Sequence, residues 1–103
     1  KRCVEMGAFI EHAYLSYLMG PNAHLGWMRN WRHVSLEMFA QAIKAAGADR
    51  SIMVTDLGQY LNPTPADGMK EFILALKKKG ITEEEINWMT RKNPARLLGL
   101  EPM

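Results

Sequence analysis

The sequence predicts a mixed α/β fold built around one strand–helix–strand unit. Two short apolar segments, 8–13 and 52–55, have the length and residue types of buried strands. Between them, apolar residues recur at helical spacing from Leu36 to Ile43, after Ser35 as the N-cap residue and before Gly47 as the stop. Because the connection contains a helix, the two strands are expected to run parallel.

Capping and turn residues define the helices outside this unit. Helices are predicted over 1–6, 65–79, 83–89 and 93–98. Thr64 precedes Pro65, which is the order of an N-cap residue and a first helical proline. Thr82 is followed three residues later by Glu85, the pattern of a capping box. The fold therefore continues after the second strand as a series of helices.

Residues 14–34 have no regular periodicity and predict a long loop that contains aromatic residues and the cations Arg29 and Arg32. Since this loop follows a strand, it is expected at the carboxyl edge of the sheet, where ligands bind in α/β proteins. It would either close on an anionic or planar substrate or pack on itself over apolar surface. His24 and His33 are expected to be ordinary loop histidines.

Composition excludes several classes of partner. The chain has 103 residues, 48% of them hydrophobic and 23% charged, which is typical of one folded domain and excludes a disordered chain. A net charge of +2 with scattered basic residues predicts no nucleic-acid partner. No apolar segment has membrane-spanning length, so no membrane partner is expected. The single cysteine, Cys3, cannot form an internal disulfide, and a cytoplasmic location is predicted.

Asp56 is the first candidate for chemistry. It follows the apolar segment 52–55 directly and is followed by Gly58 and Gln59. A buried parallel strand delivers such a residue to the edge of the sheet where catalysis takes place. The alternative is a solvated turn aspartate that caps the next segment.

Two strands do not form a complete parallel sheet, because such sheets are covered on both faces and have about four to six strands. The chain also begins at Lys1 in what reads as the middle of a helix. Residues 1–103 are therefore expected to be a single partial domain. Either further segments complete it or it assembles with copies of itself as a homo-oligomer.

Nearly the whole chain, GAFIEHAYL and then the sequence from HVSLEMFA to the end, resembles the C-terminal end of the amidohydrolase superfamily. The most specific parts are TDLGQ after the second strand and the closing NPARLLGL. The nearest resemblance is to an uncharacterised amidohydrolase-like family close to the phosphotriesterases and the TatD-type hydrolases. It implies a C-terminal βαβ-plus-helices fragment of a (β/α)8 TIM barrel, with strands seven and eight present. In the superfamily the eighth-strand aspartate, here Asp56, binds a divalent metal and accepts a proton from the bound water. Zinc is the expected metal, with manganese or iron as alternatives.

Glu11, His12 and Gln59 are the candidate substrate-binding residues. The metal-binding histidines of the superfamily come from strands that this chain does not contain, so His12 departs from the family pattern. Alternation along a strand places Glu11 and His12 on opposite faces but does not decide which of them faces the interior of a barrel. Gln59 could bind a substrate or orient the Asp56 carboxylate.

The expected function is that of the C-terminal segment of a metal-dependent hydrolase, in which metal-activated water attacks an amide, ester or phosphoester of a small molecule. The isolated chain is expected to be inactive. One alternative is a non-catalytic folding or oligomerisation module, and another is a metal-independent lyase or isomerase that uses Glu11 and Asp56. The number of metal ligands separates these alternatives, because a catalytic zinc site has about three protein ligands.

Overall fold

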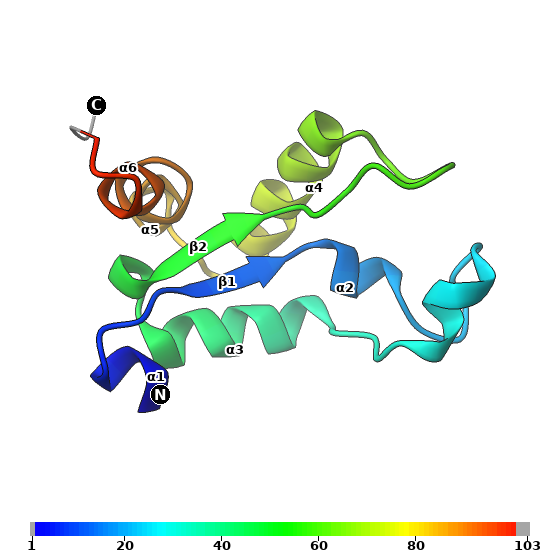
Figure 1. Ribbon diagram of the computed structural model, residues 1–103, viewed down its shortest axis with the longest axis horizontal. Coiled ribbons are helices and arrows are strands. Elements are labelled where there is room, and N and C mark those ends of the chain that lie inside the picture. The colour runs from blue at the N-terminus through cyan, green and yellow to red at the C-terminus, as the bar shows by residue number, and fades with distance from the viewer. Residues whose placement is uncertain (1, 101–103) are drawn as a thin grey trace.

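The computed structural model describes residues 2–100, which form a mixed α/β structure. At its centre are two parallel strands, β1 (Ile10–Ala13) and β2 (Ser51–Val54). Ile10 pairs with Ser51 and Ala13 with Val54, so the two carboxyl ends lie at the same edge. Figure 1 shows the strands side by side and pointing the same way. The predicted strand–helix–strand unit is confirmed, although β1 begins at Ile10 rather than at residue 8 and β2 lies one residue earlier than the predicted 52–55.

The crossover helix α3 (Leu36–Ala46) begins and ends where the sequence predicted. The Ser35 side chain accepts a hydrogen bond from the Met38 N–H at 3.2 Å, which satisfies one of the free donors of the first turn. At the other end Gly47 has a φ of 93°, a conformation that costs glycine little. A short 3-10 turn, Ala48–Arg50, then leads directly into β2.

Local capping also sets the later helices. Helix α4 (Pro65–Lys78) starts with Thr64 as its N-cap and Pro65 at its first position, as predicted. The capping box of Thr82 and Glu85 is present at the start of α5 (Glu83–Asn87). Beyond α5 the chain does not leave the helix. A π-helical turn (Trp88–Lys92) joins it to α6 (Asn93–Leu97), so the two predicted C-terminal helices are parts of one helical segment.

Short helical turns occupy part of the segment that was predicted to be a loop. Inside that segment are α2 (Leu15–Leu18) and a 3-10 helix (Gly26–Asn30). A third short helix, α1 (Arg2–Glu5), lies outside it and precedes β1. None of them is long enough to produce a repeating apolar pattern in the sequence. The Val34 N–H donates to the Ser16 carbonyl at 3.0 Å, so the segment folds back on itself. Leu15, Ala23 and Met28 form a small apolar cluster inside it.

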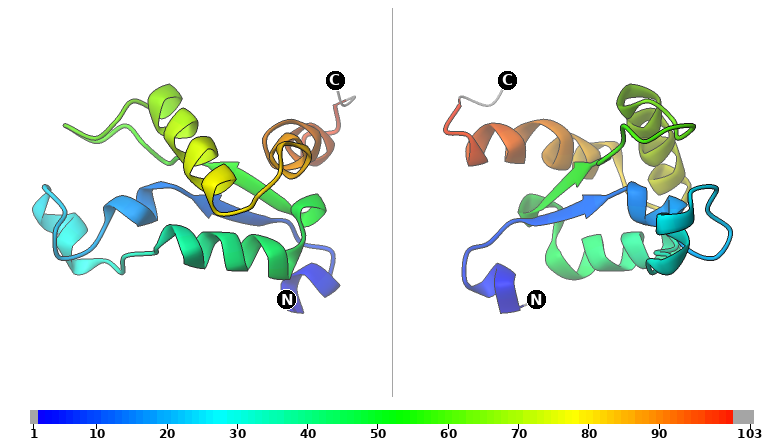
Figure 2. Two further views of the ribbon diagram at one scale, coloured as in Figure 1. Left: turned by 180° about the vertical axis from the view of Figure 1, so that it is seen from behind. Right: turned by 45° about the vertical axis from the view of Figure 1, so that its right-hand side comes forward.

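Helices α3 and α4 cover one face of the sheet. Seen from behind in Figure 2, α4 crosses the strands. Between the sheet and these helices lies the main hydrophobic core, in which Phe72 is fully buried and contacts Phe39 edge-on at a centroid distance of 5.1 Å. Tyr14, just after β1, stacks on Phe72 at 5.1 Å. Most of the stabilising apolar burial is therefore on the helix face of the sheet.

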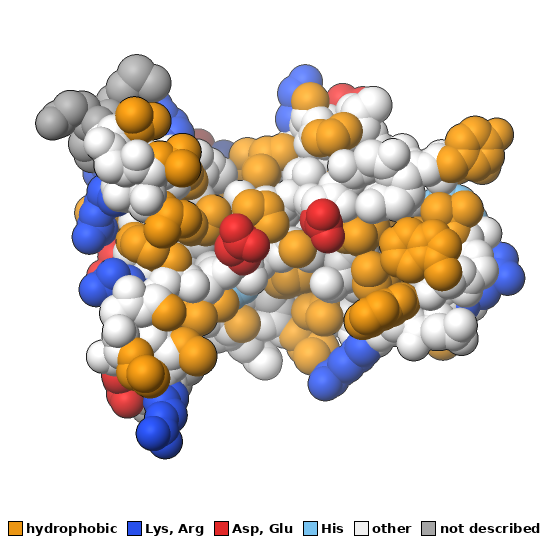
Figure 3. Space-filling view, in the orientation of Figure 1, with side chains coloured by type: hydrophobic (Ala, Val, Ile, Leu, Met, Phe, Trp, Pro, Cys, Tyr) orange, Lys and Arg blue, Asp and Glu red, His pale blue; other side chains and the backbone are white. Residues whose placement is uncertain are grey.

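The opposite face of the sheet is open in part: Glu11 is exposed there, whereas its register partner Ile52 is only 4% exposed. No ribbon crosses in front of the strands in Figure 1, and Figure 3 shows acidic side chains surrounded by hydrophobic surface on the same side. At its N-terminal end this face is partly covered by Phe9, whose ring contacts the guanidinium groups of Arg50 and Arg96 at 5.4 and 5.9 Å. None of the helices within residues 2–100 has the length and apolar character needed to cross a membrane.

Candidate functional site

The carboxyl ends of β1 and β2 meet at one edge of the sheet, and the backbone continues their pairing there. The Tyr14 N–H donates to the Val54 carbonyl and the Leu15 N–H to the Thr55 carbonyl, each at 3.0 Å. Asp56 comes next, so its position relative to β1 is fixed by the sheet itself. This edge combines the strand-end carboxylate with the two loops that follow the strands.

Asp56 is exposed and has a φ of 56°, which places it in the left-handed region that most non-glycine residues avoid. Aspartate is one of the few side chains that tolerate this region, because its short polar group makes local hydrogen bonds. The turn is held by the Leu57 N–H, which donates to Thr55 Oγ1 at 3.4 Å. The Asp56 carboxylate itself contacts no hydrogen-bond donor within residues 2–100 and is free to meet a ligand.

The side chain of Gln59 forms its hydrogen bonds within the loop that contains Asp56. Its Nε2 donates to the Asp56 carbonyl oxygen at 3.0 Å, and its Oε1 accepts from Asn62 Nδ2, also at 3.0 Å. The side chain therefore holds the backbone of Asp56 rather than its carboxylate. For a substrate to use the Gln59 amide, one of these two bonds would have to break.

The structure decides which way Glu11 and His12 face. Glu11 is exposed on the open face, whereas His12 is 5% exposed and lies on the helix face. His12 Nε2 lies 3.1 Å from Ser51 Oγ, and the Ser51 hydroxyl donates its only proton to the Gly47 carbonyl at 2.9 Å. A carbonyl can only accept, so Ser51 Oγ is left to accept and His12 donates from Nε2. Burial lowers the pKa of His12, which favours the neutral imidazole.

The candidate residues therefore separate into two groups. Glu11 and Asp56 carry exposed carboxylates, and His12 is an internal hydrogen-bond donor to Ser51. Within residues 2–100 no three His, Cys, Asp or Glu side chains come together in a way that could hold a metal ion. Of the predicted residues, Asp56 alone combines a carboxylate without a donor among residues 2–100 with a strand-end position.

Two further polar residues have roles that sequence reasoning missed. The Tyr14 hydroxyl donates to Glu71 Oε1 at 3.3 Å, and burial together with the Glu71 carboxylate raises the pKa of Tyr14 to about 12. Asn93 is fully buried, and its Nδ2 donates to the carbonyls of Ala48 and Ser51 at 2.7 and 2.8 Å. The Asn-Pro pair indicated a helix start but gave no sign that the amide reaches the sheet.

Comparisons with known proteins identify no relative. No family model matches the chain, and no match is found among curated proteins or among solved structures.

Proposed function

We propose that this chain supplies Asp56 to the active site of a metal-dependent hydrolase, as the carboxylate that binds the metal and accepts a proton from water. One observation carries the proposal: an exposed carboxylate with no hydrogen-bond donor among residues 2–100 lies just after the carboxyl end of a parallel strand, on a left-handed backbone. The substrate would be a small molecule with an amide, ester or phosphoester bond.

The arrangement of the two faces also supports a place in a (β/α)8 barrel. In such a barrel the helices cover the outside and the other face of each strand lines the interior. Here the helix face carries His12 and the open face carries Glu11. The second carboxylate would thus lie on the interior side, where it could contact a substrate.

A divalent ion would supply a bound water of lowered pKa, and Asp56 is the residue of this chain that would hold it. Carboxylate oxygen is a suitable ligand for zinc, manganese and iron. Asp56 would provide one of the roughly three ligands that catalytic zinc requires, so the remaining ligands would come from outside residues 2–100. The isolated chain is accordingly expected to be inactive, and its partner is the remainder of the barrel.

Metal content tests the proposal. In the longer polypeptide that the proposal requires, elemental analysis should find stoichiometric zinc, manganese or iron, and Asp56→Asn should remove most of it. Asparagine has the same shape and also tolerates a left-handed backbone, so the substitution changes the charge alone. Asp49→Asn is the matched control, because Asp49 is exposed and precedes β2 instead of following it.

Stoichiometric metal that is unaffected by Asp56→Asn would refute the role of Asp56. Catalysis that persists after complete metal removal and depends on both Glu11 and Asp56 would support the lyase or isomerase alternative. These results are distinguishable because the first is read from metal content and the second from turnover.

The open face favours a second candidate, a non-catalytic assembly module. In a parallel pair alternate residues bond to the neighbouring strand, so the backbone groups of Glu11 and Ala13 point away from β2, and the described part of the chain offers them no strand to pair with. Exposed parallel edges of this kind promote association. Size-exclusion chromatography with light scattering should show self-association of the isolated chain, and a stable monomer at high concentration would count against this candidate.

A further inference from the structure

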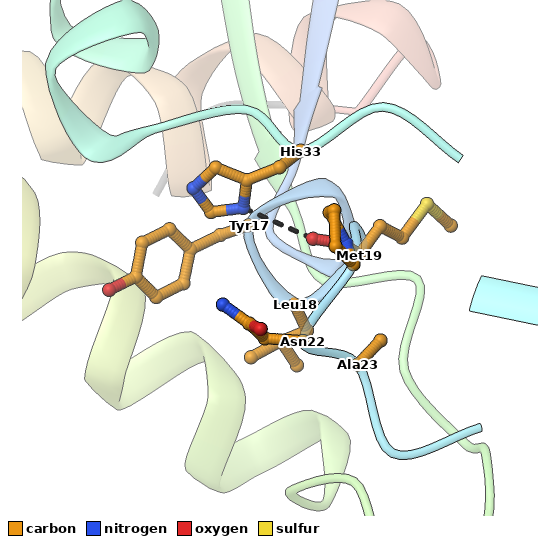
Figure 4. A pocket seen from close by; sticks show the side chains of 7 residues that line it. Tyr17, Leu18, Met19, Asn22, Ala23 and His33 are labelled. Carbon is orange, nitrogen blue, oxygen red and sulfur yellow. Dashed lines mark hydrogen bonds between the residues drawn. The ribbon is translucent and has the colours of Figure 1, made fainter. Parts of the chain in front are cut away.

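A pocket of about 370 Å³ lies beside α2 and shares no residue with the Asp56 site. It is formed by α2, the turn that follows it, and His33 just before α3, and Figure 4 shows it from close by. The Tyr17 ring, the Asn22 amide and the His33 imidazole surround the same space in this view. The size falls within the range of small-molecule sites, which are about 300–1,000 Å³.

The position of His33 is fixed by three contacts. Its Nδ1 lies 3.1 Å from the Met19 carbonyl oxygen, and the Tyr17 ring packs against the imidazole at a centroid distance of 5.4 Å. Gly20 lies beneath it with a φ of 113°, and a Cβ at Gly20 would come within 2.9 Å of the His33 Cβ. Only glycine lets the backbone approach the His33 Cβ this closely, and the exposed imidazole is oriented by its contacts with Met19 and Tyr17.

This orientation determines what His33 can bind. The Met19 carbonyl can only accept, so Nδ1 carries the proton and, in the neutral imidazole, Nε2 presents a lone pair. Nε2 is turned away from Met19 in Figure 4, and no donor within residues 2–100 contacts it. The Asn22 side chain and the Tyr17 hydroxyl likewise have no hydrogen-bond partner in the described part of the chain.

The remaining lining restricts the chemistry of the ligand further. Leu18, Met19, Pro21 and Ala23 give the pocket an apolar wall, and Tyr17 adds an aromatic ring. None of the lining residues is Lys, Arg, Asp or Glu, so nothing compensates a charged ligand. An uncharged molecule with one hydrogen-bond donor and a planar apolar body satisfies both features.

We propose that this pocket binds a small neutral aromatic compound that carries a hydroxyl group, whose hydrogen is donated to His33 Nε2. The ring of the compound lies against Leu18 and Tyr17, and the Asn22 amide contacts its polar edge. The site is independent of the proposed hydrolase, so its failure would leave the role of Asp56 unchanged. The sequence analysis expected an ordinary loop histidine, whereas this proposal makes His33 a binding residue.

Phenol is the probe and anisole its matched control, because anisole replaces the hydroxyl hydrogen with a methyl group. NMR spectra of the full chain that resolve the histidine ring protons should show saturable shifts of His33 with phenol. Anisole should bind about 3- to 10-fold more weakly, which is the factor expected for the loss of one hydrogen bond. His33→Ala should weaken phenol binding by at least the same factor.

Two other variants separate the pocket from general effects on the loop. Gly20→Ala should displace His33 and weaken phenol binding, whereas His24→Ala should leave it unchanged, since His24 belongs to the same loop but not to the pocket lining. Equal binding of phenol and anisole, no saturable shift, or full binding by His33→Ala would each overturn the proposal. If circular dichroism shows that His33→Ala is unfolded, the comparison of phenol and anisole binding to the unsubstituted chain still tests the proposal.

Discussion

Glu11 and His12 are neighbours on β1 and lie in opposite surroundings. On the helix face, His12 is enclosed by the core and bonded to Ser51, whose hydroxyl is bonded in turn to Gly47. On the open face, Glu11 is exposed. The contrast continues at the strand ends, where Tyr14 is buried and Asp56 is not. One face supplies stability, and the groups available for chemistry are on the other or at its edge.

The largest loss of stability is expected from a substitution in the middle of the helix face. Phe72→Ala removes a fully buried ring that contacts both Tyr14 and Phe39, so the free energy of unfolding should fall by about 3–5 kcal/mol. Leu74→Ala, on the same helix but 60% exposed, should cost less than about 1 kcal/mol. Urea denaturation of both variants measures the difference. Similar losses in the free energy of unfolding would mean that α4 does not pack on the sheet through Phe72.

The next effect concerns the attachment of the C-terminal helical segment to β2. Asn93→Ala removes two hydrogen bonds and leaves two carbonyls without their donor, so the free energy of unfolding should fall by about 2–3 kcal/mol. Asn87→Ala, in the same segment and with no side-chain hydrogen bond of this kind, should cost much less. Both are measured by urea denaturation, and equal costs would show that the Asn93 amide does not hold the segment.

The third effect depends on pH. Burial lowers the pKa of His12 below its ordinary value of 6.5, so below pH 6.5 the unfolded chain binds a proton that the folded chain does not. The stabilisation is therefore complete above pH 6.5 and is lost as the pH falls, by at most about 1.4 kcal/mol per pH unit. Urea midpoints measured between pH 7.5 and 5.5 should fall less steeply in His12→Gln than in the parent chain. Identical slopes would place His12 in water.

The smallest effect is expected at the edge that carries Asp56. Asp56→Asn should change the free energy of unfolding by less than about 0.5 kcal/mol, because the left-handed backbone accepts either residue. Asp56→Ala should cost about 1 kcal/mol more than Asp56→Asn, since alanine lacks the polar group that makes this conformation tolerable. Thermal unfolding of the two variants tests this. A large loss in Asp56→Asn would assign the carboxylate a structural role and weaken the catalytic proposal.

Elements with strong local signals were predictable from the sequence. Ser35, Thr64 and the pair Thr82 and Glu85 each mark a helix start through bonds to residues three positions away, and all three starts are confirmed. The order of strand, helix and strand followed from apolar segments of different length and spacing. These features depend on contacts close in sequence, which is why one sequence is enough to find them.

Other features depend on contacts between residues far apart. Alternation along β1 is symmetric, so the faces of Glu11 and His12 are decided by where α3 and α4 pack. The contacts that position His33 could not be predicted either, because Met19 and Gly20 precede it by more than ten residues in an aperiodic segment. Asp56 could be recognised as a strand-end carboxylate, but its left-handed backbone could not.

The π-helical turn at Trp88–Lys92 has a consequence for how the end of the chain can change. A π turn accommodates one residue more than an α-helix does, and each residue advances the direction of a side chain by about 100°. Deleting a single residue within this turn would restore α-helical spacing, and because the extra residue is taken up inside the turn, the direction of Asn93 toward Ala48 and Ser51 would change little. An inserted residue has no such place and would turn Asn93 by about 100°. The segment therefore tolerates the loss of one residue here better than the gain of one.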